Sequence, residues 1–201
     1  MKKLFLALLL LVSTVVFAEE TTWKSDAAHS KALFTVSHMV INEVTGRFND
    51  FDVTLVQTGS DFVGSKVTVT VKAASVNTDN EGRDKHLRSE DFFSADKFPE
   101  EKFVSTAFEK SGENTYKITG NLTLRGVTKQ VVLDAKFNGK MKSPWGNEVA
   151  GFKVTGSVKR TDFGLVWNKT LDAGGLLVGE NVDLTFQIEL GKEKKEDAPK
   201  K

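Results

Sequence analysis

The C-terminal part of the chain carries the pattern that most restricts its fold, a strict alternation of apolar and polar residues. From Val182 to Leu190 every second residue is apolar, and the residues between them are polar or charged. Successive side chains of a β-strand point to opposite faces, so this segment predicts a strand with one dry face. Similar alternation recurs at 67–72, 116–125, 131–137 and 152–159. Such segments predict an all-β fold with antiparallel strands.

The N-terminal half continues the pattern with less regular strands. We expect strands at 21–26 and 32–39, and a longer one from Val44 to Leu55. Within the longer strand, Phe48 and Phe51 are out of phase with each other, which predicts a β-bulge. Either Gly46 or the pair at 49–50 is the candidate position for that bulge.

Strands with one dry face leave two architectures, a sandwich and a closed barrel. Gly120, Gly156, Ala107 and Ala135 lie among the large residues of the apolar faces. A solid sandwich core would fill such positions, so these small residues favour a barrel with a cavity. A glycine in a strand is as often a bend or a close approach of two backbones.

The segment 83–98 interrupts the alternation with a cluster of charged residues followed by three phenylalanines. Asp84 and Arg88 have i,i+4 spacing, and we expect a short helical segment near 82–91. Phe92 and Phe93 are adjacent, so their rings point apart unless the chain turns. We predict a turn at the end of the helix, with at least one ring entering the interior. The alternative is a surface connection held by hydrophobic anchors.

The two ends of the chain do not follow the strand pattern. Lys2 and Lys3 precede an apolar stretch that ends at Ala18, which predicts a signal peptide at 1–18, cleaved after Ala18. The apolar stretch is too short for a comfortable membrane span. Residues 19–191 then form one domain, and the charged tail at 192–201 is predicted to be disordered. These features predict an exported, periplasmic protein.

Composition narrows the classes of function. The chain has no cysteine, so an exported protein of this sequence depends on packing for its stability. Its formal net charge is +1, whereas a nucleic-acid-binding protein usually carries a clear excess of positive charge, so no nucleic-acid partner is expected. Its 15 phenylalanines against one tyrosine indicate a large dry interior.

Several longer motifs resemble one known family. They are DAAHSKALFTVSHM (26–39), VTGRFNDF (44–51), VNTDNEGRDKHLRSEDFFSADKFPEEKFVS (76–105), GNLTLRGVTKQVVL (120–133), KRTDFGLVWN (159–168) and VGENVDLTFQIEL (178–190). In this order they resemble the YceI-like proteins, a bacterial lipocalin-like family that binds polyisoprenoids. The resemblance implies an extended antiparallel lipocalin-like β-barrel around a long apolar pocket. It also implies a polyisoprenoid or isoprenoid quinone as ligand, transient membrane contact and a homodimer in some members.

The residues expected to bind this ligand are mostly large and apolar. The predicted lining is Phe34, Val36, Phe48, Phe51, Phe92, Phe93, Phe98, Phe103, Leu122, Phe152, Val154, Phe163, Leu165 and Trp167. Arg83 and His86, with His38 close to them, are the candidates for contact with a polar head group. The alternative for the polar residues is a network of Asp84 and the arginines that holds the helical connection.

Catalysis and metal binding receive little support from the sequence. There is no cysteine nucleophile and no GxSxG motif. His29, His38 and His86 match no metal-ligand spacing. We therefore expect no catalytic residues, no metal and no cofactor. The alternatives are an enzyme acting on a lipid or quinone, with His86 and Asp84 as an acid–base pair, and a stress-related interaction protein with a filled barrel.

Overall fold

The computed structural model describes residues 20–172 and 174–194. Its strands are β1 (Glu20–Ser25), β2 (Lys31–His38), β3 (Asn42–Phe48), β4 (Phe51–Thr58), β5 (Lys66–Lys72), β6 (Val76–Asn77), β7 (Glu100–Lys110), β8 (Thr115–Leu124), β9 (Val127–Lys142), β10 (Glu148–Lys159) and β11 (Val178–Lys192). The helices are α1 (Glu81–Arg88) and two short 3-10 turns, η1 (Ala73–Ser75) and η2 (Arg160–Phe163). The predicted signal peptide and the tail from residue 195 lie outside the described residues. No helix of the described ranges combines the length and apolar character that a membrane span requires.

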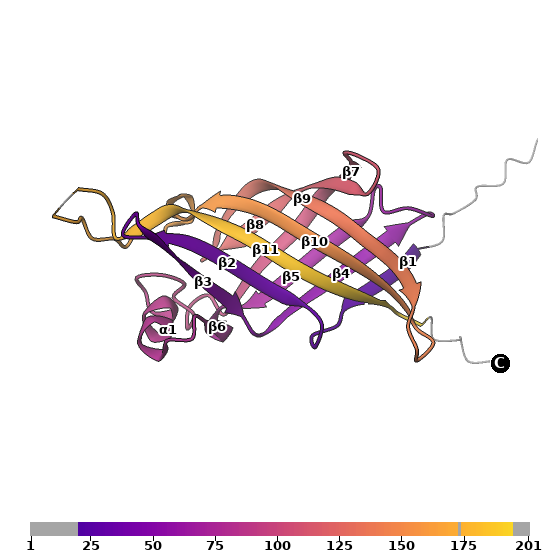
Figure 1. Ribbon diagram of the computed structural model, residues 1–201, viewed down its shortest axis with the longest axis horizontal. Helices are drawn as coiled ribbons and strands as arrows, with labels where there is room; N and C mark the ends of the chain where they lie inside the picture. Colours follow the sequence, from indigo (N-terminus) through magenta and orange to yellow (C-terminus); the bar gives the residue numbers. More distant parts are fainter. Residues whose placement is uncertain (1–19, 173, 195–201) are drawn as a thin grey trace, which may run out of the picture.

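The strands form a closed antiparallel barrel, which resolves the choice left open by the sequence. The hydrogen-bonded order runs from β1 through β4, β5, β7, β8, β9 and β10 to β11, and β11 pairs with β1. The long strand β11 also pairs with β2. β1 and β2 act as one strand of the barrel that residues 26–30 interrupt. In the same way β3 and β4 are two parts of one interrupted strand, and so are β5 and β6. The barrel therefore has eight strands. A sandwich is excluded because the sheet closes on itself (Figure 1).

The break in the third predicted strand lies at one of its two candidate positions. β3 ends at Phe48 and β4 begins at Phe51, so residues 49–50 form the interruption. Gly46 lies inside β3 and serves a different purpose. A Cβ atom there would lie 2.3 Å from Cζ of Phe34, so the glycine makes room for that ring.

Two further glycines act in the same way and correct the sequence argument. A Cβ atom at Gly120 would lie 2.4 Å from the Phe103 ring, and one at Gly156 would lie 2.4 Å from a methyl group of Leu133. Each glycine admits a neighbouring side chain and leaves no empty space of its own. The barrel was expected correctly, but these small residues mark close approaches.

The barrel interior differs between its two ends. At the end formed by β1 and the β4–β5 loop, Trp23, Phe62, Phe108 and Phe152 are almost fully buried. The other end holds α1 and the β2–β3 hairpin, and lies at the opposite side of Figure 1. β11 extends to Lys192, and Glu193 pairs with Lys24, so ordered structure continues beyond the predicted limit at 191.

Candidate functional site

A cavity of about 510 Å³ lies inside the barrel towards the end that holds α1. Most of its lining is aliphatic or aromatic and comes from the inward faces of the strands. The alternative of a filled barrel is therefore not favoured. Gly82 and Arg83 line the cavity and are also exposed, so the cavity reaches the surface beside the first turn of α1.

Most of the predicted binding residues lie on the cavity wall. These are Phe34, Val36, His38, Phe48, Arg83, His86, Phe92, Phe93, Phe103, Leu122, Val154, Leu165 and Trp167. Strand alternation explains the agreement, because Phe34, Val36 and His38 occupy every second position of β2. Their contact with a ligand remains a prediction.

Phe152 and Phe51 were predicted as lining but belong to the packed core. The ring of Phe152 lies 4.9 Å from that of Phe62, centroid to centroid, and 5.2 Å from that of Phe137. Phe152 lies near the start of β10, at the filled end of the barrel. Period-2 reasoning identifies the inward face but does not give the depth along the barrel.

Phe98 and Phe163 are also absent from the cavity wall, and both lie in connecting segments. Phe163 ends η2 and packs in a small cluster with Val158. Phe98 lies against Gly126 in the β8–β9 turn, where a Cβ atom would come within 2.8 Å of the ring. The Phe98 ring thus anchors its connection to the barrel, which was the alternative role for the aromatic residues of 83–98, and Phe163 belongs to the packed core.

The turn after α1 has the predicted form. α1 ends at Arg88, and Ser94 has a positive φ of 50°. This turn allows both Phe92 and Phe93 to line the cavity. The ring of Phe93 packs edge to face against the ring of Phe48. The ring of Phe92 lies 5.4 Å from that of Trp167, centroid to centroid.

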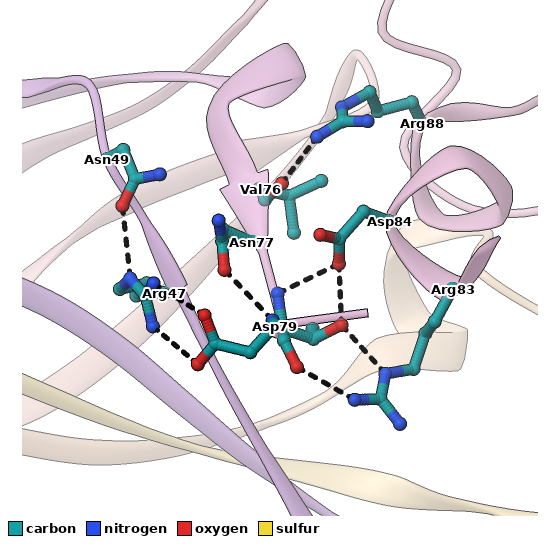
Figure 2. Close-up of polar contacts among 9 residues, drawn as sticks. Arg47, Asn49, Val76, Asn77, Asp79, Arg83, Asp84 and Arg88 are labelled. Atoms are coloured by element: carbon teal, nitrogen blue, oxygen red, sulfur yellow. Dashed lines mark hydrogen bonds and ion pairs between the residues drawn. The ribbon is translucent and has the colours of Figure 1, made fainter. Parts of the chain in front are cut away.

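The charged residues of 83–88 form a network that holds α1 against β6. Asp84 accepts hydrogen bonds from the backbone N–H and the hydroxyl group of Thr78. Arg83 donates to the Thr78 hydroxyl and carbonyl oxygens, and Arg88 donates to the Val76 carbonyl (Figure 2). The i,i+4 pair of Asp84 with Arg88 is not formed, because each side chain has these other partners. The structural role predicted for this network is therefore observed.

His86 has an acidic partner other than the one expected for an acid–base pair. Its Nε2 atom lies 2.8 Å from Oδ2 of Asp91, whereas Asp84 is engaged by Thr78. The imidazole ring also lies 4.7 Å from the Trp167 ring, centroid to centroid. The arrangement fixes one wall of the cavity and does not assemble the predicted pair.

The three histidines are not brought together. His38 and His86 line the cavity, whereas His29 lies on the exposed surface. There its Nδ1 atom lies 3.0 Å from Oδ2 of Asp26 and 4.0 Å from Oε1 of Glu189. These contacts are explained by exposed ion pairs, and each contributes little to stability.

Two buried charged residues of the cavity wall were missed by the sequence reasoning. Arg160 is 4% exposed and donates hydrogen bonds to the carbonyl oxygens of Leu165, Trp167, Val178 and Gly179. Burial lowers the pKa of its guanidinium group, and Glu180 opposes this shift. Arg160 ties the segment after η2 to the start of β11, so its hydrogen bonds hold the wall in place.

Glu101 is the second buried charged residue and is 3% exposed. Its Oε2 atom accepts a hydrogen bond from the backbone N–H of Arg125 at 2.8 Å, and its Oε1 atom has no partner. Burial raises the pKa of the carboxyl group to about 7, and the Arg125 N–H opposes the shift. The signal in the sequence was the position of Glu101 two residues before Phe103 on the same face of β7.

Several aliphatic lining residues were also missed. They include Val44, Val67, Val69, Val71, Ile118, Val131, Leu133, Val182, Leu184 and Ile188, and the aromatic Phe186 was missed as well. Most lie in segments whose alternation was recognised, so their inward direction was available. The predicted lining favoured large aromatic residues, whereas more than half of the wall consists of aliphatic side chains.

Comparison with known proteins agrees with this architecture. The model of the YceI-like domain matches residues 23–190. UPF0312 protein SAS2572 of Staphylococcus aureus is 38% identical over 170 residues, covering 84% of this chain and 96% of that protein. The Campylobacter jejuni YCEI protein is 35% identical, with a TM-score of 0.67, over 79% of this chain and 90% of the other.

More distant structures share the fold. Burkholderia cenocepacia BcnA is 22% identical with a TM-score of 0.72, over 82% of this chain and 98% of that chain. A polyisoprenoid binding domain from Saccharophagus degradans is 15% identical with a TM-score of 0.61, over 85% and 98% of the two chains. None of these four relatives has the name of an enzyme. The family match spans nearly the whole barrel, and the chain belongs to the YceI-like domain family.

Proposed function

We propose that the protein holds a polyisoprenoid or an isoprenoid quinone in its internal cavity, for transport or storage. The observation that carries the proposal is the cavity itself, about 510 Å³ and lined mainly by apolar side chains. This volume falls within the usual range of small-molecule sites. The polyisoprenoid binding domain of Saccharophagus degradans, which shares the fold, supports the choice of ligand.

The physical chemistry of such a ligand defines what the protein must supply. Burial of each CH₂ group from water contributes about 0.8 kcal/mol. A tail taken from a bilayer is already out of water, so transfer into the cavity is close to neutral. Selectivity then depends on the shape of the cavity and on a few polar groups in its wall.

Transient membrane contact through the β2–β3 hairpin is part of this proposal. Val40 and Ile41 at its tip are 70% and 83% exposed, and the neighbouring Leu176 is also exposed. Met39 and Val40 have φ angles of 55° and 66°, which is uncommon for any residue other than glycine and most unusual for the β-branched Val40. Strain of this kind often marks a functional site. The tip adjoins His38 and Leu177, which line the cavity.

Export and dimerisation belong to the proposal as well. The basic and apolar sequence of residues 1–18 supports export to the periplasm. There the protein exchanges the isoprenoid ligand with a membrane. A homodimer is supported by the family resemblance alone.

The direct test is to purify the mature protein from the periplasm of its host and to extract it with organic solvent. Mass spectrometry should find an isoprenoid lipid at close to one molecule per chain. The lipid-free protein should also take up added isoprenoid quinone. A matched variant, Val69→Phe, places a ring inside the cavity and should reduce both signals. A wild-type protein with no lipid and no uptake would overturn the proposal.

A further inference from the structure

Among the carboxyl groups of the described residues, Glu101 is the one with a fully buried oxygen atom that has no hydrogen-bond partner. It belongs to the inward face of β7 and lines the cavity together with Phe103. Its other oxygen atom is fixed by the N–H of Arg125, so the free oxygen has a defined position. The wall therefore holds one oriented, buried carboxyl oxygen among mostly apolar side chains.

This arrangement has a cost that the fold does not explain. A buried polar atom without a partner destabilises the native state by about 1–3 kcal/mol. A glutamine at this position would accept the same Arg125 hydrogen bond, and a leucine would suit the apolar wall better. By contrast, the buried Asp84 accepts two hydrogen bonds from Thr78, and the buried Arg160 donates to four carbonyl groups. A ligand atom is the missing partner that would remove the cost at Glu101.

The chemistry of this partner follows from the surroundings. The other ionisable side chains of the wall are His38 on β2, Arg83 and His86 on α1, Lys102 on β7 and Arg160 on η2. Arg83, His86 and Arg160 already have hydrogen-bonding partners. A negatively charged phosphate group next to Glu101 would be repelled by the carboxylate. A hydroxyl or carbonyl group is uncharged and would not be repelled. We propose that Glu101 hydrogen-bonds the uncharged oxygen head group, a hydroxyl or a carbonyl, of the isoprenoid held in the cavity.

This inference rests on the proposed carrier function and adds the head group to it. The two head groups respond differently to pH. A protonated carboxyl group donates to a carbonyl oxygen, and a carboxylate does not. A hydroxyl group can accept from the acid and can also donate to the carboxylate. Burial raises the pKa of Glu101 to about 7, so quinone binding should weaken between pH 6 and pH 8 while alcohol binding persists.

The experiment compares the wild type with Glu101→Gln and Glu101→Leu. Four probes of similar tail length are used: an isoprenoid quinone, a polyprenol, a polyprenyl phosphate and the hydrocarbon squalene. Trp167 lines the cavity, so a change in its fluorescence on titration reports binding, by quenching for the quinone and by displacement of the bound quinone for the other three probes. Thermal unfolding of each variant at both pH values shows that folded proteins are compared.

The wild type at pH 6 should bind the quinone and the polyprenol about tenfold more tightly than squalene, the effect of one hydrogen bond. Glu101→Leu should bind all three with equal affinity. Glu101→Gln keeps a donor at every pH, so its quinone affinity should be the same at pH 6 and pH 8.

Two outcomes separate this inference from the carrier function. If Glu101→Leu keeps the wild-type preference for oxygen head groups, or if the phosphate binds most tightly to the wild type, the role of Glu101 is wrong and the carrier function stands. If the wild type binds none of the four probes, squalene included, the carrier function itself is wrong.

Discussion

The two ends of the barrel are built from the same strands, yet one is filled and the other is hollow. At the filled end the ring of Phe62 lies within 4.9–6.5 Å of the rings of Trp23, Tyr116, Phe137 and Phe152, centroid to centroid. At the hollow end the wall is mainly aliphatic and encloses about 510 Å³. Phe62 therefore lies at the centre of the aromatic cluster that fills this end of the interior.

The plug at the filled end comes from a loop. Phe62 lies between β4 and β5, and the loop is held by a chain of hydrogen bonds. The indole N–H of Trp23 donates to the Gln57 side chain, whose amide donates to the Asp61 carbonyl. At the other end α1 lies near β3 and β6 (Figure 1), and its residues Arg83, His86 and Leu87 line the cavity.

Buried charge also separates the two ends. Asp84, Glu101 and Arg160 are the charged residues that are buried within the described part of the chain, and all three lie at the hollow end. Buried charges require partners. The protein supplies those of Asp84 and Arg160, and we propose that a ligand supplies the one that Glu101 lacks.

The largest expected effect is the loss of the plug in Phe62→Ala. Truncating a large buried aromatic residue should lower the free energy of unfolding by about 3–5 kcal/mol. Urea unfolding measures this loss. Lipid affinity of the folded fraction should stay close to wild type, because Phe62 is not part of the cavity wall.

The same truncation at the hollow end sharpens the comparison. Phe93 is half-buried, so Phe93→Ala should cost about 1–2 kcal/mol of stability. It should weaken lipid binding beyond what the loss of stability explains. Wild-type affinity in folded Phe93→Ala would show that the segment after α1 is a structural anchor only.

The hollow end should also carry a pH dependence of stability. The pKa of Glu101 is about 7 in the folded state against 4.5 ordinarily, so the folded protein retains a proton that the unfolded chain loses between these values. Stability should therefore fall as pH rises from 4.5 to 7, by up to about 3 kcal/mol, and level off above.

Urea unfolding of lipid-free protein across this pH range measures the effect, with Glu101→Gln as the control. The amide does not titrate, so the variant should lack this part of the fall. Parallel profiles of the two proteins would contradict a raised pKa at Glu101.

Added volume should be tolerated at one end and not at the other. Ala135 is 2% exposed within the filled core, and Ala135→Val should cost about 1–3 kcal/mol through overpacking. Val69→Phe adds more volume, but its ring enters the cavity, so its cost should be below about 1 kcal/mol. The reverse order in thermal unfolding would show that the cavity closes in solution.

The smallest effect concerns the tip of the hollow end. Val40→Gly removes a β-branched residue from the left-handed region and should raise stability by up to about 1 kcal/mol. The variant should also extract isoprenoid from vesicles more slowly, while binding detergent-delivered isoprenoid as the wild type does. An unchanged extraction rate would contradict membrane contact through this hairpin.

Sequence reasoning predicted the candidate site in part. It identified the inward faces, the helix, the turn after it and the two aromatic residues Phe92 and Phe93 that line the cavity. It placed Phe152 on the cavity wall although this ring belongs to the filled end. Period-2 alternation gives the direction of a side chain across the sheet and carries no information about its depth.

The sequence by itself determined the strands, their dry faces and membership of a family, because these depend on local alternation and on ordered motifs. Only the tertiary structure decided where space remains, because packing depends on side chains that are distant in sequence. Phe62 reaches the core from a loop, and Gly120 admits the ring of Phe103. The unpartnered oxygen of Glu101 became visible in the same way, since hydrogen-bond satisfaction is a property of the assembled interior.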